Sequence, residues 1–98
     1  ILQALDTNGY LINVARGSVV NEKDLIIALQ NKVIKGAALD VFEDEPNPNP
    51  ALITLANVLL TPHIGSATEE TRKAMTNLAL DNLEAFFNRR PLLTPISF

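Results

Sequence analysis

Residues 36–42 read Gly-Ala-Ala-Leu-Asp-Val-Phe, a run that stays apolar until Asp40. A short, continuously apolar run of this kind is typical of a strand covered on both faces in a parallel sheet. Two comparable runs lie at residues 10–15 and 57–61, and Pro62 stops the second of them. The sequence therefore predicts three buried strands.

The segments between the strands differ from each other. Asn21 is a good N-cap for a helix in which Leu25, Ala28 and Leu29 recur at helical spacing. Three prolines at 46, 48 and 50 predict an irregular loop, with a short helical turn at residues 51–55. Strand, helix, strand, loop and strand in this order predict an α/β fold with a parallel sheet and right-handed crossovers.

A long helix is predicted after the last strand. Ser66 and Glu69 have the spacing of a capping box, and we expect the helix to run to Asn88. Its apolar residues keep the helical rhythm: Met75, Leu78, Ala79, Leu83, Phe86 and Phe87. The tail that follows, Pro91–Ile96, is apolar and extended and has no evident partner in the preceding chain. We expect the helix face and the tail to pack on protein outside these residues.

Composition excludes several classes of function. The chain has 98 residues, 47% of them hydrophobic, and a net charge of −3 with scattered lysines and arginines, which argues against nucleic-acid binding. It has no cysteine and a single histidine, so neither disulfides nor a metal site is expected, and a reducing, cytoplasmic compartment fits best. Its apolar runs are shorter than the roughly 18 residues of a membrane span. The sequence begins at Ile1 without an initiator methionine, within an amphipathic segment, so we expect it to be part of a longer chain.

Ionisable residues gather where the predicted strands end. Arg16 follows the first strand, Asp40 ends the second with Glu45 just beyond it, and His63 follows the third. In open parallel sheets ligands bind outside the carboxyl ends of the strands. The sequence therefore predicts that these four side chains lie at one edge of the sheet.

Three of these side chains have the chemistry needed to reduce a 2-oxo acid. Arg16 offers a rigid fork of donors that can bind a carboxylate and polarise the neighbouring carbonyl. His63 can give a proton to the carbonyl oxygen as a hydride reaches the carbon. Glu45 is suited to hold the far ring nitrogen of the histidine, which fixes its tautomer and stabilises the imidazolium.

Simpler interpretations remain open for each residue taken alone. Arg16 fits a solvated strand exit, Glu45 an ordinary acidic loop, and His63 a packed loop histidine. Asp40 closes an apolar strand and needs a partner, which a helix N-terminus or backbone amides can supply. The catalytic hypothesis depends on finding these residues together.

Three linked motifs resemble one known family. Asn13–Gly17, Gly36–Pro46 and Leu60–Ser66, in this order and spacing, closely resemble the D-isomer-specific 2-hydroxyacid dehydrogenases over nearly the whole chain. The resemblance implies that residues 1–65 are the C-terminal half of an NAD(P)-binding Rossmann-type domain. It further implies that residues 66–98 form a long helix and tail that return to a substrate domain.

The resemblance also assigns residues to roles. Arg16, Glu45 and His63 match the catalytic residues, and Asp40 matches the residue that meets the nicotinamide side of the cofactor. The positions matching the cofactor-binding set are Val14, Ala15, Arg16, Asp40, His63, Ile64, Gly65 and Ser66. The family's G-x-G-x-x-G turn and the acidic residue beyond it are absent from this sequence, whose glycines are at 9, 17, 36 and 65. NAD or NADP is therefore implied without a choice between them.

Within the family, a glyoxylate or hydroxypyruvate reductase is the expected subclass, acting on a small-molecule 2-oxo acid as a homodimer. We expect these 98 residues alone to be inactive. The alternative is a corepressor-like module that uses the same fold to sense NAD(H), and turnover of 2-oxo acids distinguishes the two.

Overall fold

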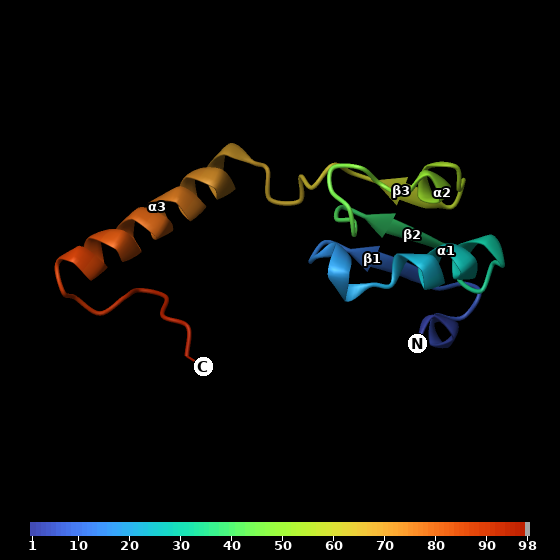
Figure 1. Ribbon diagram of the computed structural model, residues 1–98, viewed down its shortest axis with the longest axis horizontal. Helices are drawn as coiled ribbons and strands as arrows, with labels where there is room; N and C mark the ends of the chain where they lie inside the picture. Colours follow the sequence, from blue (N-terminus) through green and yellow to red (C-terminus); the bar gives the residue numbers. More distant parts are fainter. Residues whose placement is uncertain (98) are drawn as a thin grey trace. The chain divides into compact units, whose positions relative to one another are not determined.

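The computed structural model describes residues 1–97, and the chain divides into two compact units, Ile1–Gly65 and Ser66–Phe98. Figure 1 labels the helices and strands of both. The two units have the same bounds as the two segments inferred from the sequence. Their assignment to two domains of a dehydrogenase stays a prediction.

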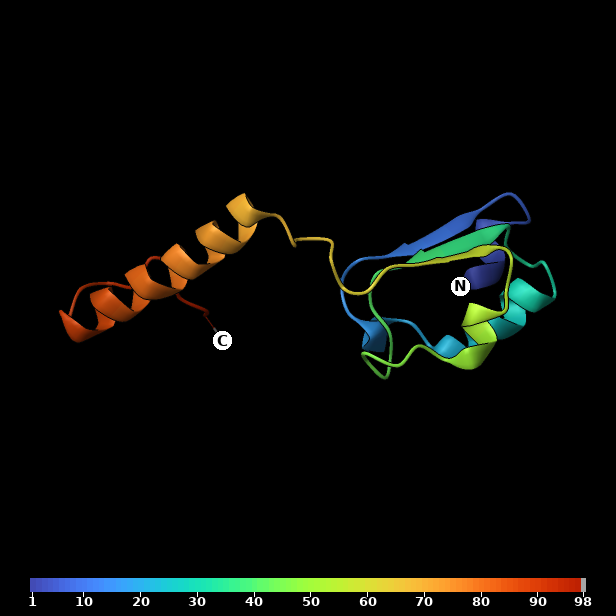
Figure 2. The same ribbon diagram turned by 90° about the horizontal axis from the view of Figure 1, so that it is seen from above.

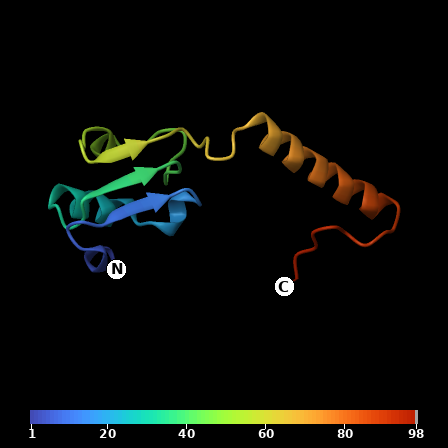
Figure 3. The same ribbon diagram turned by 180° about the vertical axis from the view of Figure 1, so that it is seen from behind.

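A parallel sheet forms the centre of the first unit. Its strands are β1 (Tyr10–Asn13), β2 (Gly36–Leu39) and β3 (Val58–Leu60), in the order β1-β2-β3, and Figure 3 shows their arrows pointing the same way. The pairing places Ile12 opposite Ala38 and Ala38 opposite Leu59. The predicted parallel α/β fold is confirmed, although each strand is shorter than the apolar run that predicted it.

Helices connect the strands. The helix α1 (Glu22–Gln30) follows β1, and its N-cap Asn21 accepts a hydrogen bond from the backbone N–H of Asp24 at 3.1 Å, as the sequence predicts. The short α2 (Pro50–Ile53) precedes β3 and is capped by Asn49. Two 3₁₀ turns complete the unit, η1 (Leu2–Leu5) and η2 (Gly17–Val19).

The core lies on one face of the sheet only. Figure 2 shows α1 and α2 on the same side of the strands. The buried cluster combines both helices with β2 and the segments next to it: Leu25, Ile26, Ala28, Leu29, Ile34, Ala37, Leu39, Phe42 and Leu52. On the other face Ile12 and Leu59 are 71% and 63% exposed.

The expectation of buried strands holds for β2, whose residues are buried or half-buried, and is wrong for β1 and β3, where Ile12 and Leu59 leave the second face of the sheet open. The topology explains the result, because strands added in one direction by right-handed crossovers place every connecting helix on the same side. A second layer of helices would have to come from a strand order that reverses, and β1-β2-β3 does not reverse.

The second unit is a helix with a tail. The helix α3 (Glu69–Phe87) is capped by Thr68, whose hydroxyl accepts a hydrogen bond from the N–H of Thr71 at 3.1 Å. The predicted capping box at Ser66 is wrong, because Thr68 places Glu69 and Glu70 in the first turn, where the helix dipole favours negative charge. At about 1.5 Å per residue the 19 residues extend about 28 Å.

The tail has a partner in the preceding chain, which the sequence did not predict. The side-chain oxygen of Asn82 accepts hydrogen bonds from the backbone N–H groups of Leu93 and Thr94, at 3.0 and 3.2 Å. Its amide nitrogen donates to the Thr94 hydroxyl and to the Leu78 carbonyl. One asparagine thus folds the tail back along α3.

Most apolar side chains of α3 are exposed, as predicted. Leu78, Leu83, Phe86 and Phe87 are 42%, 54%, 65% and 77% exposed, and Ala85 is the buried residue of the helix. None of the helices in residues 1–97 has both the length and the apolar character that crossing a bilayer requires.

Candidate active site

The predicted ionisable residues meet at the carboxyl edge of the sheet. All strands are parallel, so the segments that follow β1, β2 and β3 leave the sheet at the same edge. Arg16 lies after β1, Asp40 directly after β2, and His63 after β3. The loop that continues from β2 brings Glu45 to His63. The predicted grouping of these four residues is confirmed.

Glu45 and His63 form the central contact. Their Oε2 and Nδ1 atoms are 2.6 Å apart, and the two side chains are 33% and 47% exposed. An ionised carboxylate can only accept hydrogen bonds, so Nδ1 carries a hydrogen and Nε2 is the ring nitrogen left for other partners. The other carboxylate oxygen of Glu45 accepts the N–H of Phe42 at 3.2 Å. The imidazole is therefore held in one tautomer by a carboxylate that is itself fixed.

The charge state of Glu45 follows from these bonds. The hydrogen bond to His63 is the main cause that lowers the pKa of Glu45 below its usual value of 4.5. The Phe42 amide and the positive charges of His63 and Arg16 lower this pKa further, whereas partial burial opposes the change. Glu45 is thus an anion at neutral pH, and the charge of Arg16 reaches it.

Asp40 organises the loop that carries His63. It is 7% exposed, and its Oδ1 accepts hydrogen bonds from the Thr61 hydroxyl at 2.6 Å and the Ile64 N–H at 2.9 Å. Its Oδ2 accepts the Gly65 N–H at 2.8 Å. These bonds, with Thr61 the largest cause, lower the pKa of Asp40 below its usual value of 3.8. Backbone amides satisfy this carboxylate, as the simpler interpretation required, and a contact with the cofactor stays a prediction.

The backbone at His63 has an uncommon conformation. Its φ is 53°, in the left-handed region that few residues other than glycine adopt. The N–H of His63 donates to the carbonyl of Thr61 at 3.0 Å, and the next two N–H groups bind Asp40. Such strain persists only where the surroundings over-determine it, and it is frequent at functional sites.

Asn13 shapes the turn that carries Arg16. It is 5% exposed; its amide nitrogen donates to the Arg16 carbonyl at 2.9 Å, and its oxygen accepts the Ala15 N–H at 3.1 Å. The Arg16 side chain is exposed and donates to the carbonyl of Ala15. Its guanidinium therefore stands at the edge of the sheet with donors available to a ligand.

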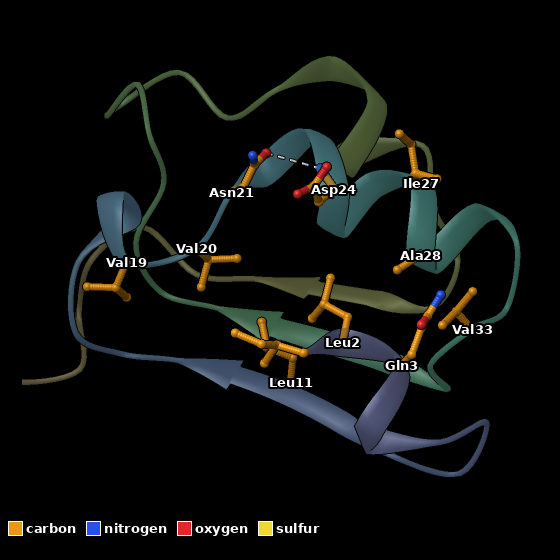
Figure 4. A pocket seen from close by; sticks show the side chains of 11 residues that line it. Leu2, Gln3, Leu11, Val19, Val20, Asn21, Asp24, Ile27, Ala28 and Val33 are labelled. Carbon is orange, nitrogen blue, oxygen red and sulfur yellow. Dashed lines mark hydrogen bonds between the residues drawn. The ribbon is translucent and has the colours of Figure 1, made fainter.

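A small hollow adjoins the Glu45–His63 pair. Its volume is 260 Å³, and its walls are mostly apolar: Phe42, Glu45, Pro46, Pro48, Leu60, Thr61, Pro62 and His63. A larger hollow of 470 Å³ lies between η1, β1 and α1, where Figure 4 shows Leu2, Leu11 and Val20 around it. Its polar side chains include Asn21, which caps α1. The larger hollow has the carboxylate of Asp24 in its wall, whereas the smaller one is lined by the hydrogen-bonded Glu45–His63 pair.

Comparisons with known proteins agree with this geometry. Residues 1–65 match the family described as D-isomer specific 2-hydroxyacid dehydrogenase, NAD binding domain. The chain belongs to this family. It is 55% identical to a 2-ketogluconate reductase of Gluconobacter oxydans, and the match covers 97% of this chain and 31% of that protein. It is 51% identical to a glyoxylate/hydroxypyruvate reductase of Arabidopsis thaliana, over 98% of this chain and 31% of the relative.

A solved structure is also similar. The NADPH-dependent glyoxylate/hydroxypyruvate reductase of Sinorhizobium meliloti, in complex with NADP and malonate, has a TM-score of 0.93 and 53% identity. The match covers 98% of this chain and 30% of that one. The chain thus spans about a third of the length of the relatives named here. The family description and this neighbour support NAD or NADP as the cofactor.

The remaining predicted cofactor positions in the first unit lie at the same edge. Val14 and Ile64, on the loops after β1 and β3, are 69% and 51% exposed, which suits contact with a flat ring. Gly65 lies against Asp40, because a Cβ there would be 3.0 Å from Oδ2. Ser66 begins the second unit. Its proposed contact with the cofactor stays a prediction.

Asn13 and Thr61 are site residues that sequence reasoning missed. Each is a polar residue that closes an apolar run, Asn13 three positions before Arg16 and Thr61 two positions before His63, and that position is the only signal that marks them. Thr61 binds a carboxylate of another segment, which no local pattern reveals, whereas Asn13 binds Ala15 and Arg16 in its own turn.

Proposed function

We propose that this chain is the C-terminal third of an NAD(P)-dependent D-2-hydroxyacid dehydrogenase that reduces a small 2-oxo acid, with glyoxylate or hydroxypyruvate as the favoured substrates. The observation that carries the proposal is the 2.6 Å contact between Glu45 and His63 at the edge where Arg16 also lies. The names of the relatives support the substrate class.

Arg16 is proposed to bind and polarise the substrate. The planar guanidinium can donate two parallel hydrogen bonds to a carboxylate, or one to the carboxylate and one to the neighbouring 2-oxo group. Its exposure at the edge of the sheet supports this role. Polarisation grows as the carbonyl oxygen gains negative charge, so Arg16 favours the transition state over the bound substrate.

His63 is proposed to be the general acid. When bound, the nicotinamide cofactor would supply the hydride for the carbonyl carbon. His63 then gives the proton on Nε2 to the carbonyl oxygen, while Glu45 on Nδ1 stabilises the imidazolium before transfer and keeps the ring oriented after it. The apolar walls of the adjoining hollow would shield one side of this proton from water, although His63 is 47% exposed in the described residues.

The cofactor is proposed to lie along the loops at the same edge. Val14, Ala15 and Arg16 would line it from the loop after β1, and His63, Ile64, Gly65 and Ser66 from the loop after β3. Asp40 would meet its nicotinamide side while holding the second loop in place. The acyclic structure of glyoxylate or hydroxypyruvate is compatible with a small hollow of 260 Å³.

We propose further that the whole enzyme is a cytoplasmic homodimer. The lack of cysteine in these residues supports a reducing compartment. The exposed apolar side chains of α3 and of the open sheet face require partners. A two-fold dimer is the commonest way for a soluble protein to cover such surfaces.

Steady-state turnover tests the function. The full-length enzyme is assayed with NADH and with NADPH against a panel that includes glyoxylate, hydroxypyruvate and 2-ketogluconate. Saturable oxidation of the cofactor with one of these acids is the expected result. Tight cofactor binding without turnover of any 2-oxo acid would instead favour the corepressor-like module, which the named relatives do not support.

A further inference from the structure

Two glutamates outside the catalytic set bind each other's backbone. The Oε1 of Glu22 accepts the N–H of Glu43 at 2.7 Å, and the Oε1 of Glu43 accepts the N–H of Glu22 at 3.2 Å. Glu22 is 6% exposed, although a glutamate is almost never buried without a partner. The bonds are reciprocal and join residues far apart in the sequence, and we call this pair of bonds the Glu22–Glu43 tie.

The tie joins the two loops that carry the proposed catalytic residues. Glu22 is the first residue of α1 and follows the turn of Arg16, whereas Glu43 lies two positions before Glu45. Phe42, next to Glu43, donates its N–H to Glu45. The backbone that holds the Glu45 carboxylate is therefore anchored directly by Glu22.

Gly17 brings the same two loops into backbone contact. A Cβ at Gly17 would lie 1.9 Å from the carbonyl oxygen of Phe42 and 2.6 Å from the nitrogen of Glu43. No side chain can occupy that space, so the Arg16 turn and the Phe42–Glu43 segment touch through their main chains. This contact and the Glu22–Glu43 tie leave little freedom to shift one loop against the other.

Forming the Glu22–Glu43 tie costs free energy, which argues against an incidental contact. A buried carboxylate is costly unless hydrogen bonds satisfy it, and two carboxylates on neighbouring amides also repel each other. The positive end of the α1 dipole offsets part of this cost, because the Glu43 carboxylate binds the first N–H of that helix.

We propose that Glu22 is a positioning residue, which through the Glu22–Glu43 tie sets the placement of the Arg16 loop relative to Glu45 and His63. The proposal rests on the proposed function of these three residues. A substrate held by Arg16 must present its carbonyl to the proton of His63, so a shift between the two loops changes both substrate binding and proton transfer.

The test uses the full-length enzyme and paired variants. Glu22→Ala removes the acceptor for Glu43, whereas Glu22→Gln keeps an oxygen that can accept the same N–H. Glu43→Ala removes the other half of the tie from an exposed position, where misfolding is a smaller concern. Asp24→Ala is the matched control, since it removes an exposed acidic side chain from the same first turn of α1.

We expect Glu22→Ala and Glu43→Ala each to lower kcat by about 10-fold or more and to raise KM for the 2-oxo acid, since small misplacements of reacting groups can cost up to about 100-fold. Hydrogen exchange at residues 42–45 should accelerate in both. In Glu22→Gln, kcat and KM should stay within about 3-fold of the wild-type values. The glutamine oxygen still accepts the Glu43 N–H, although a neutral acceptor makes a weaker hydrogen bond than a charged one. Asp24→Ala should match the wild type.

The outcomes separate this inference from the proposed function. A lower kcat with unchanged KM and proportionately less folded enzyme would indicate a purely structural glutamate and overturn the positioning role. Unchanged kinetics in both alanine variants would also overturn it. If the wild type reduces no 2-oxo acid, the proposed function is wrong whatever the variants do. Hydrogen exchange at residues 42–45 tests the Glu22–Glu43 tie separately, and unchanged exchange in Glu43→Ala would show that the tie does not hold this segment.

Discussion

Asp40 and Glu45 are both carboxylates on the segment that follows β2, but their hydrogen-bond partners differ, and so do their roles. Both oxygens of Asp40 accept hydrogen bonds, from the Thr61 hydroxyl and from two backbone N–H groups of the His63 loop. Glu45 binds one amide and one imidazole, and the imidazole is the group that can exchange a proton with a ligand. Asp40 therefore fixes where His63 is, and Glu45 fixes which of its nitrogens is free.

The first prediction concerns proton donation by His63. In the full-length enzyme, His63→Ala should lower kcat at least about 100-fold, because general acid catalysis commonly contributes 10²–10⁴-fold. Steady-state kinetics with a 2-oxo acid and the preferred cofactor measure the effect. Arg72→Ala, at an exposed cation on α3, is the control and should retain wild-type rates. A His63→Ala enzyme that kept most of its activity would show that the proton comes from another group.

The second prediction concerns stability at acid pH. The folded-state pKa values of Asp40 and Glu45 lie below their usual values of 3.8 and 4.5. A group with a depressed folded-state pKa stabilises the fold fully above its unfolded-state pKa, and this contribution is lost as the pH falls through the folded-state value. The Tm of the full-length protein should therefore drop as the pH is lowered from about 5 towards about 3.

Asp40→Asn isolates one part of that effect. The asparagine keeps one acceptor oxygen, but its NH₂ group would face a backbone N–H that donates to Asp40 in the wild type. Two donors then face each other, so Tm should fall at neutral pH. Because the variant has already lost the charge, its Tm should also depend less on pH below about pH 5. Asp24→Asn, at an exposed position, is the control. Equal slopes of Tm against pH in Asp40→Asn and the wild type would contradict the prediction.

At the scale of the elements, the regular parts followed from the sequence and the contacts between them did not. The strands and α1 each leave a periodic or continuous apolar signal, and Asn21 marks the start of α1. The start of α3 was misplaced because Ser66 and Thr68 are both good caps, and only the backbone chooses between them. Arg16, Asp40 and His63 were found because a strand end is a position that sequence can locate.

Other site residues left no such signal. Asn13 binds only Ala15 and Arg16 in its own turn, whereas Glu22 and Thr61 act through bonds to residues 21 positions away. Their types are common at helix starts and strand ends for local reasons, so their partners emerge only once the chain is folded. The left-handed backbone of His63 was equally hidden, because it depends on the amides that bind Asp40.

The third prediction concerns the second unit as an element. Asn82→Ala should release the tail from α3, because the Asn82 side chain alone makes the bonds to the backbone N–H groups of Leu93 and Thr94 and to the Thr94 hydroxyl. The loss should be about 1 kcal/mol for each bond that water does not replace. Hydrogen exchange at Leu93 and Thr94 should accelerate, while Asn77→Ala, at an exposed position of the same helix, should leave it unchanged. Unaltered exchange in Asn82→Ala would show that the tail is held by something else.

At the scale of the whole molecule, the exposed apolar surface is the main feature. One face of the sheet carries Ile12 and Leu59 in the open, and all-parallel sheets in proteins almost always have both faces covered. The second unit adds Phe86 and Phe87, at 65% and 77% exposure. A chain of 98 residues with two such surfaces is a poor candidate for a stable monomer on its own.

The fourth prediction is that these 98 residues alone neither bind NAD(P)H tightly nor oxidise it. In dinucleotide-binding sheets the pyrophosphate lies on a glycine-rich turn and a helix N-terminus, where backbone N–H groups and the helix dipole meet its charge. The four glycines of this sequence do not form that turn. Under the proposed function, the edge that carries Arg16 and His63 would contact the nicotinamide half only, so most of the binding energy would be missing.

Titration of the purified 98-residue chain with NADH tests this prediction, with nicotinamide fluorescence and calorimetric heat followed together. We expect no saturation below millimolar cofactor and sedimentation as a mixture of associated species. The full-length enzyme, titrated in the same way, is the control and should saturate in the micromolar range. Saturation of the short chain at micromolar NADH would contradict the prediction. It would mean that the loops carrying Val14 and Ile64 hold the dinucleotide without a glycine-rich turn, or that copies of the chain build the missing half of the site from one another.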